Sequence, residues 1–393
     1  MNDFQAVAIQ NSKIIFPEKV EEGKVLLLRD GKIAGIVGRD DFNPEDYLTI
    51  DAAGKYTAPG LIDLHVHGCY NHTFNESDPE AFDTILRNTL RYGITTLVPT
   101  LVAAPIPNLI QSLCFIDKWK SEQKPGITQI TGAYLESPYI APQAAGAIPA
   151  SALRKITDGS IDQILELSYA ISIFMIAPEL EGAMDAIRKI KQKGIIAAMG
   201  HSMAMESEII PAIEAGASHV THLWSAMSSV VRQGPWRKPG LLEVALVYPQ
   251  LTTEIIADNR HLPPTLMKLA VKAKGDKVCA VSDALNGAGL PEGSHFFVGE
   301  NEYEVVDGVG MVADRSCFAG STTLLSQEIP ILVKEVGLSI PEAIRMVTEI
   351  PAKILGIADK KGSIRTGLDA DIILLDSNFK IHEIFQQGIL IQF

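Results

Sequence analysis

The chain alternates short apolar runs with amphipathic segments through most of its length. Between residues 58 and 360, eight apolar runs have the length and composition of buried strands: Leu61–Val66, Thr95–Pro99, Ile127–Glu136, Ala170–Ala177, Ile195–His201, His219–His222, Leu251–Ala257 and Val278–Asp283. Segments of helical period lie between many of them: Asp78–Tyr92, Ile161–Leu167, Glu181–Lys193, Met205–Ala215 and Pro263–Ala273. Such alternation is typical of β/α units around a parallel sheet.

Eight such units in about 300 residues favour a TIM-type (β/α)8 barrel over an open doubly wound sheet, whose glycine-rich fingerprint is absent. Both ends of the chain have a different pattern, with short strand-like runs at Ala6–Gln10, Lys13–Phe16, Lys24–Arg29, Ile33–Val37, Asp371–Asp376 and Ile389–Phe393. We therefore predict an α/β fold with the barrel at residues 58–360. Residues 1–57 and 361–393 are predicted to form one small β-sandwich domain built from both termini.

Composition and charge narrow the class of protein. With 47% hydrophobic and 21% charged residues, the chain has enough apolar side chains for a large core. The net charge of −13 argues against a surface for nucleic acid or anionic membranes, because both need clustered basic residues. Met1–Ser12 lacks the features of a signal peptide, no apolar run is long enough to span a bilayer, and the cysteines have no CxxC spacing. We expect a cytoplasmic protein with no nucleic-acid or membrane partner.

The first predicted strand ends in two histidines. His65 and His67 stand two positions apart, so in a strand both imidazoles leave on the same side and could bind one metal ion. The alternative is that one is a core residue and the other a surface residue. Other predicted strands also end in residues that bind metals: Glu136, His201, His222 and Asp283. The carboxyl ends of barrel strands meet on one face, so we expect all six side chains to converge there.

These histidines and carboxylates suit Zn²⁺, or else Fe²⁺, Mn²⁺ or Co²⁺, better than Ca²⁺ or Mg²⁺. Six ligands exceed what one site with an open position needs, so we predict one or two divalent ions per chain, with Glu136 bridging a pair. A metal ion there would lower the pKa of water and polarise a carbonyl, which predicts metal-assisted hydrolysis. Asp283 would pass the proton of water to the departing amine. His261, just beyond the seventh strand, would hold the scissile carbonyl or a substrate hydroxyl, unless it is a surface histidine.

At these residues the sequence resembles the amidohydrolase superfamily and, within it, the N-acetylglucosamine-6-phosphate deacetylase family. The shared motifs follow the family's order over nearly the whole chain: Ala58–Gly68, Pro99–Leu101, Leu135–Pro138, Ala177–Glu179, Gly200–Ser202, Thr221–Met227, Ile255–Asp258 with His261, Val281–Ala284 and Ala319–Ser321. The resemblance implies a small-molecule substrate, an N-acetyl amino sugar phosphate, whose acetamide is hydrolysed. N-acetylglucosamine-6-phosphate would give glucosamine-6-phosphate and acetate.

The resemblance also implies roles for individual residues. Glu136, His201 and His222 would be the principal metal ligands, while His65 and His67 would match the members that keep a second metal ion. Substrate contacts are implied for the arginine before a Pro-Gly pair and for the two residues that follow the Thr-His-Leu-aromatic motif: Arg237, Ser225 and Ala226.

Arg237 belongs to the basic segment Arg232–Lys238, which on charge alone is best interpreted as a solvated loop. An arginine fork nevertheless matches a phosphate dianion, and the resemblance implies a homodimer in which Arg237 reaches the neighbouring subunit's site.

Four departures from the family pattern concern the substrate. Ser137 replaces the glycine after the metal-binding Glu, Ser225 replaces an asparagine, and Asn259 replaces a small residue. The family has a histidine about a dozen residues past the metal-binding Glu, which here is Glu136. This chain lacks it, since residues 141–150 contain no histidine. All four positions are expected to hold substrate rather than metal, so we include Ser137 and Asn259 among the candidate substrate-binding residues.

Two alternatives remain at this point. One is an amidohydrolase of the same fold that acts on another N-acyl or cyclic amide. The other is a sugar-phosphate sensor without catalysis, against which Asp283 argues, because a pure binding site has no use for a proton shuttle.

Overall fold

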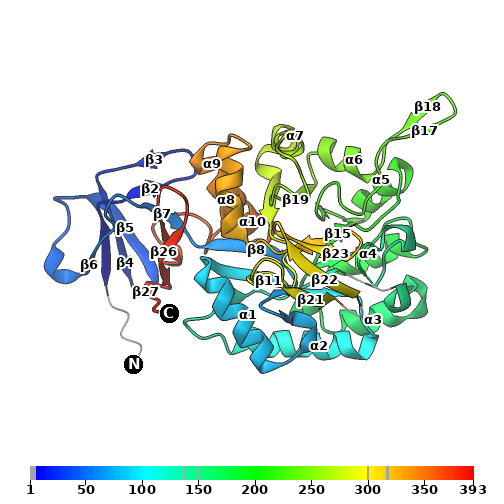
Figure 1. Cartoon of the computed structure of the whole chain (residues 1–393), viewed down its shortest axis with the longest axis horizontal. Coiled ribbons are helices and arrows are strands. Elements are labelled where there is room, and N and C mark those ends of the chain that lie inside the picture. The colour runs from blue at the N-terminus through cyan, green and yellow to red at the C-terminus, as the bar shows by residue number, and fades with distance from the viewer. Residues whose placement is uncertain (1–5, 137, 149, 299–300, 316–317) are drawn as a thin grey trace.

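The computed structural model describes residues 6–136, 138–148, 150–298, 301–315 and 318–393. At its centre is a parallel barrel whose eight strands are β8 (Leu61–Val66), β11 (Ile94–Val102), β13 (Ala133–Glu136), β14 (Ile171–Met175), β15 (Ile196–Met199), β16 (His219–Val220), β19 (Thr252–Ile256) and β20 (Val278–Val281). The backbone N–H of Asp283 donates to the carbonyl oxygen of His65 at 2.9 Å, and Val66 forms a parallel bridge with Ala284. The last strand therefore lies beside the first, and the predicted (β/α)8 barrel is confirmed (Figure 1).

Helices surround the barrel strands in Figure 1. Those in the described residues are α1 (Pro79–Arg91), α2 (Ile106–Ser121), α3 (Ser160–Leu165), α4 (Ala183–Gln192), α5 (Glu206–Ala215), α6 (Leu241–Val247), α7 (Pro264–Lys274), α8 (Leu325–Lys334), α9 (Ile340–Met346) and α10 (Glu349–Ile354). Local sequence explains α1: the Asp78 carboxylate accepts hydrogen bonds from two backbone N–H groups of the first turn, and Pro79 takes the first helical position. Its buried face follows the i, i+3, i+4 spacing with Phe82, Ile85 and Leu86.

One predicted strand is divided in two. The run Ile127–Glu136 forms β12 (Gln129–Ile130) and β13, and both pair with β11. Gly132, between them, has a φ of 151°, a backbone conformation that residues with a side chain rarely adopt. The strand is interrupted there, and β13 alone carries Glu136 to the carboxyl end of the barrel.

Both ends of the chain form a pair of sheets beside the barrel (Figure 1). One sheet has the order β5-β4-β1-β6 and the other the order β27-β26-β25-β7-β2-β3. Their strands are β1 (Val7–Gln10), β2 (Lys13–Ile15), β3 (Val20–Glu21), β4 (Lys24–Arg29), β5 (Lys32–Gly38), β6 (Leu48–Asp51), β7 (Tyr56–Pro59), β25 (Ile372–Leu375), β26 (Ile381–Gln386) and β27 (Ile389–Leu390).

An apolar core from both sheets fills the space between them, with Ile9, Leu26, Ile372 and Phe385 fully buried. The predicted boundary between residues 57 and 58 lies inside β7, which pairs with β25. The domain limits themselves stay predictions.

Several elements were not predicted from the sequence pattern. A short pair, β9 (Gly68–Cys69) and β10 (His72–Thr73), follows β8, and an exposed hairpin, β17 (Val231–Gln233) with β18 (Trp236–Lys238), follows β16. After β20 the chain forms a four-stranded antiparallel sheet of β21 (His295–Val298), β22 (Asn301–Val306), β23 (Val309–Val312) and β24 (Phe318–Ser321). The strands of the first two pairs have only two or three residues each, too few to show a hydrophobic period.

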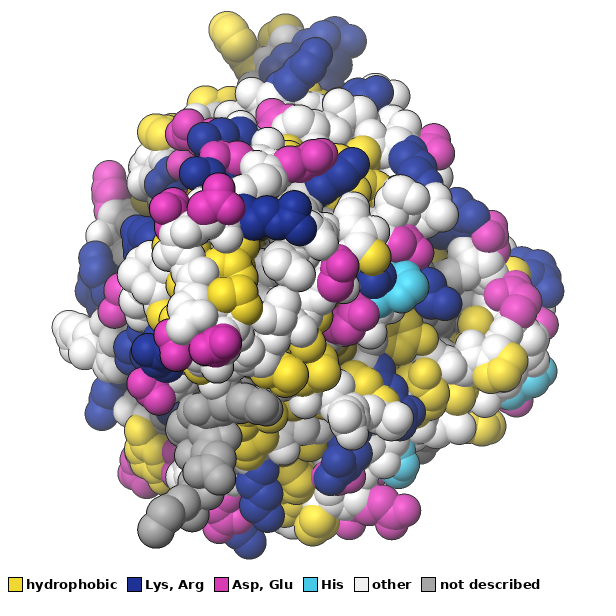
Figure 2. Space-filling model, turned by 90° about the vertical axis from the view of Figure 1, so that its left-hand side faces the viewer, with side chains coloured by type: hydrophobic (Ala, Val, Ile, Leu, Met, Phe, Trp, Pro, Cys, Tyr) yellow, Lys and Arg dark blue, Asp and Glu magenta, His cyan; other side chains and the backbone are white. Residues whose placement is uncertain are grey.

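Within the described residues, no helix has the length and hydropathy needed to cross a membrane. On the face shown in Figure 2, Lys and Arg side chains are interspersed with Asp and Glu side chains instead of forming one large basic patch. The hairpin β17–β18 stands out from the molecule at the top of Figures 1 and 2.

Candidate metal centre and active site

Six predicted ligand residues meet at the carboxyl ends of the barrel strands. His65 lies in β8 and Glu136 ends β13, while the others follow β8, β15, β16 and β20 at His67, His201, His222 and Asp283. All six are buried, with at most 8% of any residue exposed. The parallel barrel brings them together because every one of these strands points to the same face.

Glu136 is the centre of this group. Its Oε1 lies 3.0 Å from His201 Nε2, 3.1 Å from His222 Nε2 and 3.6 Å from His65 Nε2. Two sets of three residues have ligand atoms within 4.8 Å of one another, and both contain Glu136: one with His65 and His67, the other with His201 and His222. The arrangement therefore has room for one or two ions that share this carboxylate.

The nitrogens of the cluster also fit a metal ion. His65 Nε2 is buried and has no hydrogen-bond partner, although it lies 3.4 Å from Asp283 Oδ1 and 3.6 Å from Glu136 Oε1. A buried polar atom without a partner costs about 1–3 kcal/mol. A divalent cation held between this nitrogen and the two carboxylates would remove that cost.

Charge in the cluster keeps the carboxylates ionised. Burial opposes the charge on Glu136, but the charge of His201 and hydrogen bonds with His201 and His222 hold the pKa of Glu136 well below its ordinary value. Burial likewise opposes the charge on Asp283, whereas the charge of His65 and a hydrogen bond with His67 lower the pKa of Asp283. Asp283 is therefore an ionised group that can accept a proton at neutral pH.

Backbone conformation aims two of these side chains. His201 has a φ of 44° and Asp283 a φ of 46°, in the left-handed region that residues other than glycine seldom adopt. Both residues lie two positions beyond the last residue of a barrel strand. Such strain is concentrated at functional sites, where the surrounding structure holds it in place.

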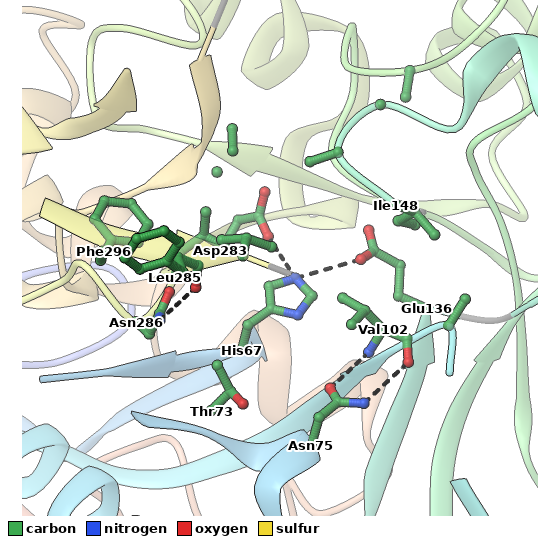
Figure 3. Close-up of a pocket in the computed structure, with 18 of the residues that line it drawn as sticks. His67, Thr73, Asn75, Val102, Glu136, Ile148, Asp283, Leu285, Asn286 and Phe296 are labelled. Carbon is green, nitrogen blue, oxygen red and sulfur yellow. Dashed lines mark hydrogen bonds and ion pairs between the residues drawn. The ribbon is translucent and has the colours of Figure 1, made fainter. Parts of the chain in front are cut away.

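A cavity of about 980 Å³ opens over the cluster. Figure 3 shows His67 between Glu136 and Asp283, and its Nε2 lies 3.4 Å from Glu136 Oε2 and 3.1 Å from Asp283 Oδ1. Apolar side chains form much of the remaining wall, including Ile148, Leu285, Phe296 and Phe297. The cluster thus forms the floor of a pocket whose upper wall is largely apolar.

Three predicted substrate contacts line this cavity: Ser225, Ala226 and His261. His261 Nδ1 lies 2.7 Å from Asp258 Oδ2. Burial opposes the charge on Asp258, but its hydrogen bond with His261 lowers the pKa of this carboxyl group. Asp258 had no role predicted from the sequence, and it fixes the orientation of the His261 ring, which lines the cavity.

The other predicted contacts lie elsewhere. Arg237 is exposed on β18, and neither it nor Asn259 lines the cavity of its own chain. Ser137 lies outside the described residues. Among the described residues no Lys or Arg lines the cavity, so a phosphate bound there would need a cation from another part of the molecule or from a second copy.

A second layer of polar residues, missed in the sequence, lies behind the cluster. Glu254 Oε2 is 3.0 Å from His65 Nδ1, and Glu254 Oε1 is 2.8 Å from His219 Nε2. Burial opposes the charge on Glu254, but the charge of His65 and hydrogen bonds with His219 and His65 lower the pKa of Glu254. The available signal was a single carboxylate within the otherwise uncharged run Leu251–Ala257, because buried charges need partners.

Comparison with known proteins places this fold and cluster in a family. The model of the amidohydrolase family matches residues 56–390. The chain belongs to the amidohydrolase family. The resemblance in its motifs is confirmed.

This amidohydrolase is similar to two curated deacetylases over nearly its whole length. It is 31% identical to N-acetylgalactosamine-6-phosphate deacetylase of Escherichia coli O157:H7, with 94% of each chain covered. It is 29% identical to N-acetylglucosamine-6-phosphate deacetylase of Bacillus subtilis, with 96% of this chain and 95% of the relative covered.

A solved structure agrees with these relatives. N-acetylglucosamine-6-phosphate deacetylase from Pasteurella multocida superposes with a TM-score of 0.91 at 28% identity, covering 98% of this amidohydrolase and 99% of that chain. The small domain built from both termini therefore accompanies the barrel in that relative too.

Proposed function

We propose that this amidohydrolase removes the acetyl group of N-acetylglucosamine-6-phosphate, giving glucosamine-6-phosphate and acetate. The observation that carries the proposal is the convergence of Glu136, His201 and His222 with the ionised Asp283 on the floor of one cavity. The deacetylases to which the chain is similar support the substrate class.

In this proposal Glu136, His201 and His222 hold a divalent metal ion, and His65 with His67 and Glu136 can hold a second. The ion supplies a Lewis acid that polarises the amide carbonyl and acidifies water. Nitrogen and carboxylate ligands favour Zn²⁺, with Fe²⁺, Mn²⁺ or Co²⁺ as alternatives.

Residues of the chain would transfer the proton, orient the acetamide and bind the sugar. Asp283 accepts the proton of the attacking water and delivers it to the amine as the carbon–nitrogen bond breaks. His261, fixed by Asp258, orients the acetamide carbonyl or a sugar hydroxyl. The backbone at Ser225 and Ala226 lines the same cavity and offers polar groups to the sugar.

Phosphate recognition is proposed to come from a second copy of the chain. Arg237 and Arg232 face each other across the hairpin β17–β18, an arrangement of like charges that destabilises the hairpin unless an anion lies against it. Val230, Val231 and Trp236 are exposed on the same hairpin. Apolar side chains beside a projecting arginine pair are suited to a dimer contact, so we propose a homodimer in which Arg237 completes the neighbour's site. We also propose that the enzyme is cytoplasmic, which is consistent with a phosphorylated sugar as its substrate.

Acetate release from a panel of substrates tests the function. We expect turnover of N-acetylglucosamine-6-phosphate and much weaker turnover of the unphosphorylated sugar. N-acetylgalactosamine-6-phosphate is the second candidate, because a relative at 31% identity bears that name. The kcat/KM ratio of the two epimers decides between them, and absence of acetate from every N-acetyl sugar would refute the substrate class.

A further inference from the structure

Glu254 contacts the candidate metal cluster from behind. It lies in β19, is fully buried, and places Oε2 at 3.0 Å from His65 Nδ1. The other nitrogen of the same ring, Nε2, points to the cluster, at 3.4 Å from Asp283 Oδ1. The two edges of the His65 imidazole therefore face Glu254 and the cluster respectively.

This contact determines which nitrogen of His65 carries a proton. An ionised carboxylate can only accept hydrogen bonds, so Nδ1 must donate and hold the hydrogen. Metal binding requires a neutral ring, and with the hydrogen held on Nδ1 the lone pair of that ring is on Nε2, which is the nitrogen that lacks a hydrogen-bond partner. Glu254 thus presents His65 in the form that binds a metal ion.

The Glu254 carboxylate is itself held in place. Its Oε1 lies 2.8 Å from His219 Nε2, and its Oε2 also accepts the backbone N–H of His222 at 3.3 Å. His219 Nδ1 is in turn 2.7 Å from Thr252 Oγ1. A chain of contacts therefore runs from Thr252 through His219 and Glu254 to His65, and all four lie in or beside three barrel strands.

The other metal-binding set is supported differently. His201 Nδ1 contacts the carbonyl oxygen of Ala144 at 2.7 Å, and Glu136 contacts His201 and His222 directly. Glu254 touches this set only through the backbone N–H of His222. Loss of the Glu254 carboxylate should therefore affect the two sets unequally.

We propose that Glu254 is a positioning residue that enables the set of His65, His67 and Glu136 to hold a second divalent ion. This inference rests on the proposed metal-dependent function. Partners that orient a ligating histidine in this way typically change metal affinity by about 10–100-fold.

Glu254→Gln tests the inference with little change in volume. A glutamine has one acceptor oxygen instead of two and cannot serve His65 and His219 as the carboxylate does. Wild-type and variant proteins would be loaded with Zn²⁺, dialysed against graded chelator and analysed for bound zinc by mass spectrometry. We expect the second zinc ion to leave Glu254→Gln at about 10–100-fold lower chelator strength, while the first zinc ion stays.

Two further variants keep the test decisive. Thr253→Val is the matched control at the neighbouring position of β19. It removes a buried hydroxyl group that has no hydrogen-bond partner, so this variant should bind zinc like the wild type. His219→Gln changes the side chain that holds Glu254 in place but keeps the Glu254 carboxylate, so it should weaken binding of the second zinc ion less than Glu254→Gln does. If Glu254→Gln does not fold, this weakening in His219→Gln supports the inference.

Unchanged affinity for the second ion in a folded Glu254→Gln protein would overturn the inference. A wild-type protein that binds only one ion would overturn it as well and leave the deacetylase proposal standing. A wild-type protein that binds no ion would refute both.

Discussion

Asp283 shows how one residue's surroundings determine its chemistry. Burial by itself would raise the pKa of this carboxyl group and keep it neutral, but His65 and His67 lie close enough to lower it instead. The residue is thus an ionised base in a place from which most water is excluded. A divalent ion held by these histidines would favour the ionised carboxylate in the same way, because it too would place positive charge beside Asp283.

Replacing Asp283 by asparagine should lower turnover by at least about a hundredfold, because an amide cannot accept and return the proton. Glu136, His201 and His222 remain in this variant, so we expect it still to bind metal. Steady-state kinetics and metal content, measured on the same preparation, check both statements. Wild-type turnover in Asp283→Asn would remove Asp283 from the mechanism.

Among the secondary-structure elements, helix α7 carries a buried cation at its carboxyl end. Lys274 is 6% exposed and donates from Nζ to the carbonyl oxygen of Tyr248 at 2.7 Å. Burial, with a smaller effect of Lys277, lowers the pKa of Lys274 to about 8. The folded protein therefore releases this proton more easily than the unfolded chain, whose lysines have a pKa near 10.4.

This difference predicts how stability depends on pH. Between pH 8 and about pH 10.4 the lysine binds its proton in the unfolded chain but not in the folded protein, so the free energy of unfolding should rise with pH over this range. As the pH falls back through 8, the stability gained from the uncharged Lys274 should be lost. In Lys274→Met the rise should be smaller by on the order of 2 kcal/mol. Urea unfolding at several pH values measures it.

Lys272→Met, at an exposed position of the same helix, is the matched control and should follow wild type. Equal pH profiles for Lys274→Met and wild type would contradict the lowered pKa.

At the scale of the whole molecule, the barrel and the two-sheet unit are joined where strand β8 follows strand β7 after a single residue. Pro59 in β7 pairs with Ile372 in β25, and β8 begins only two residues later, at Leu61. The side chain of Gln386 in β26 also donates to the carbonyl oxygen of Ile127 in the barrel at 2.7 Å. The two chain ends thus support the first barrel strand, which carries His65, without contributing to the cavity.

The proposed dimer leads to a prediction about KM. Arg237→Ala should raise KM for a phosphorylated substrate far more than for its unphosphorylated analogue, with little change in kcat, because the arginine binds a group remote from the amide. Lys238→Ala, on the same strand, is the matched control and should have a smaller effect. Equal increases for both substrates would exclude phosphate recognition by Arg237.

The hydrophobic pattern predicted the barrel because a parallel strand buried on both faces is a continuous apolar run, as Val278–Val281 shows. The predicted metal ligands stood at the ends of such runs, and the active-site residues of this fold lie at the carboxyl ends of its strands. Short elements such as β17 and β18 carry too few residues for a period to appear, so the pattern could not reveal the hairpin that presents Arg237.

By itself the sequence determined the order of elements and which histidines and carboxylates stand at strand ends, because both depend on neighbours along the chain. Only the tertiary structure decided which of them meet. Glu254 lies 189 residues from His65 in sequence and contacts it only because the barrel closes. Arg237 and Asn259, by contrast, do not line the cavity of their own chain, and Arg237 lies on the hairpin β17–β18, which the pattern along the chain did not reveal.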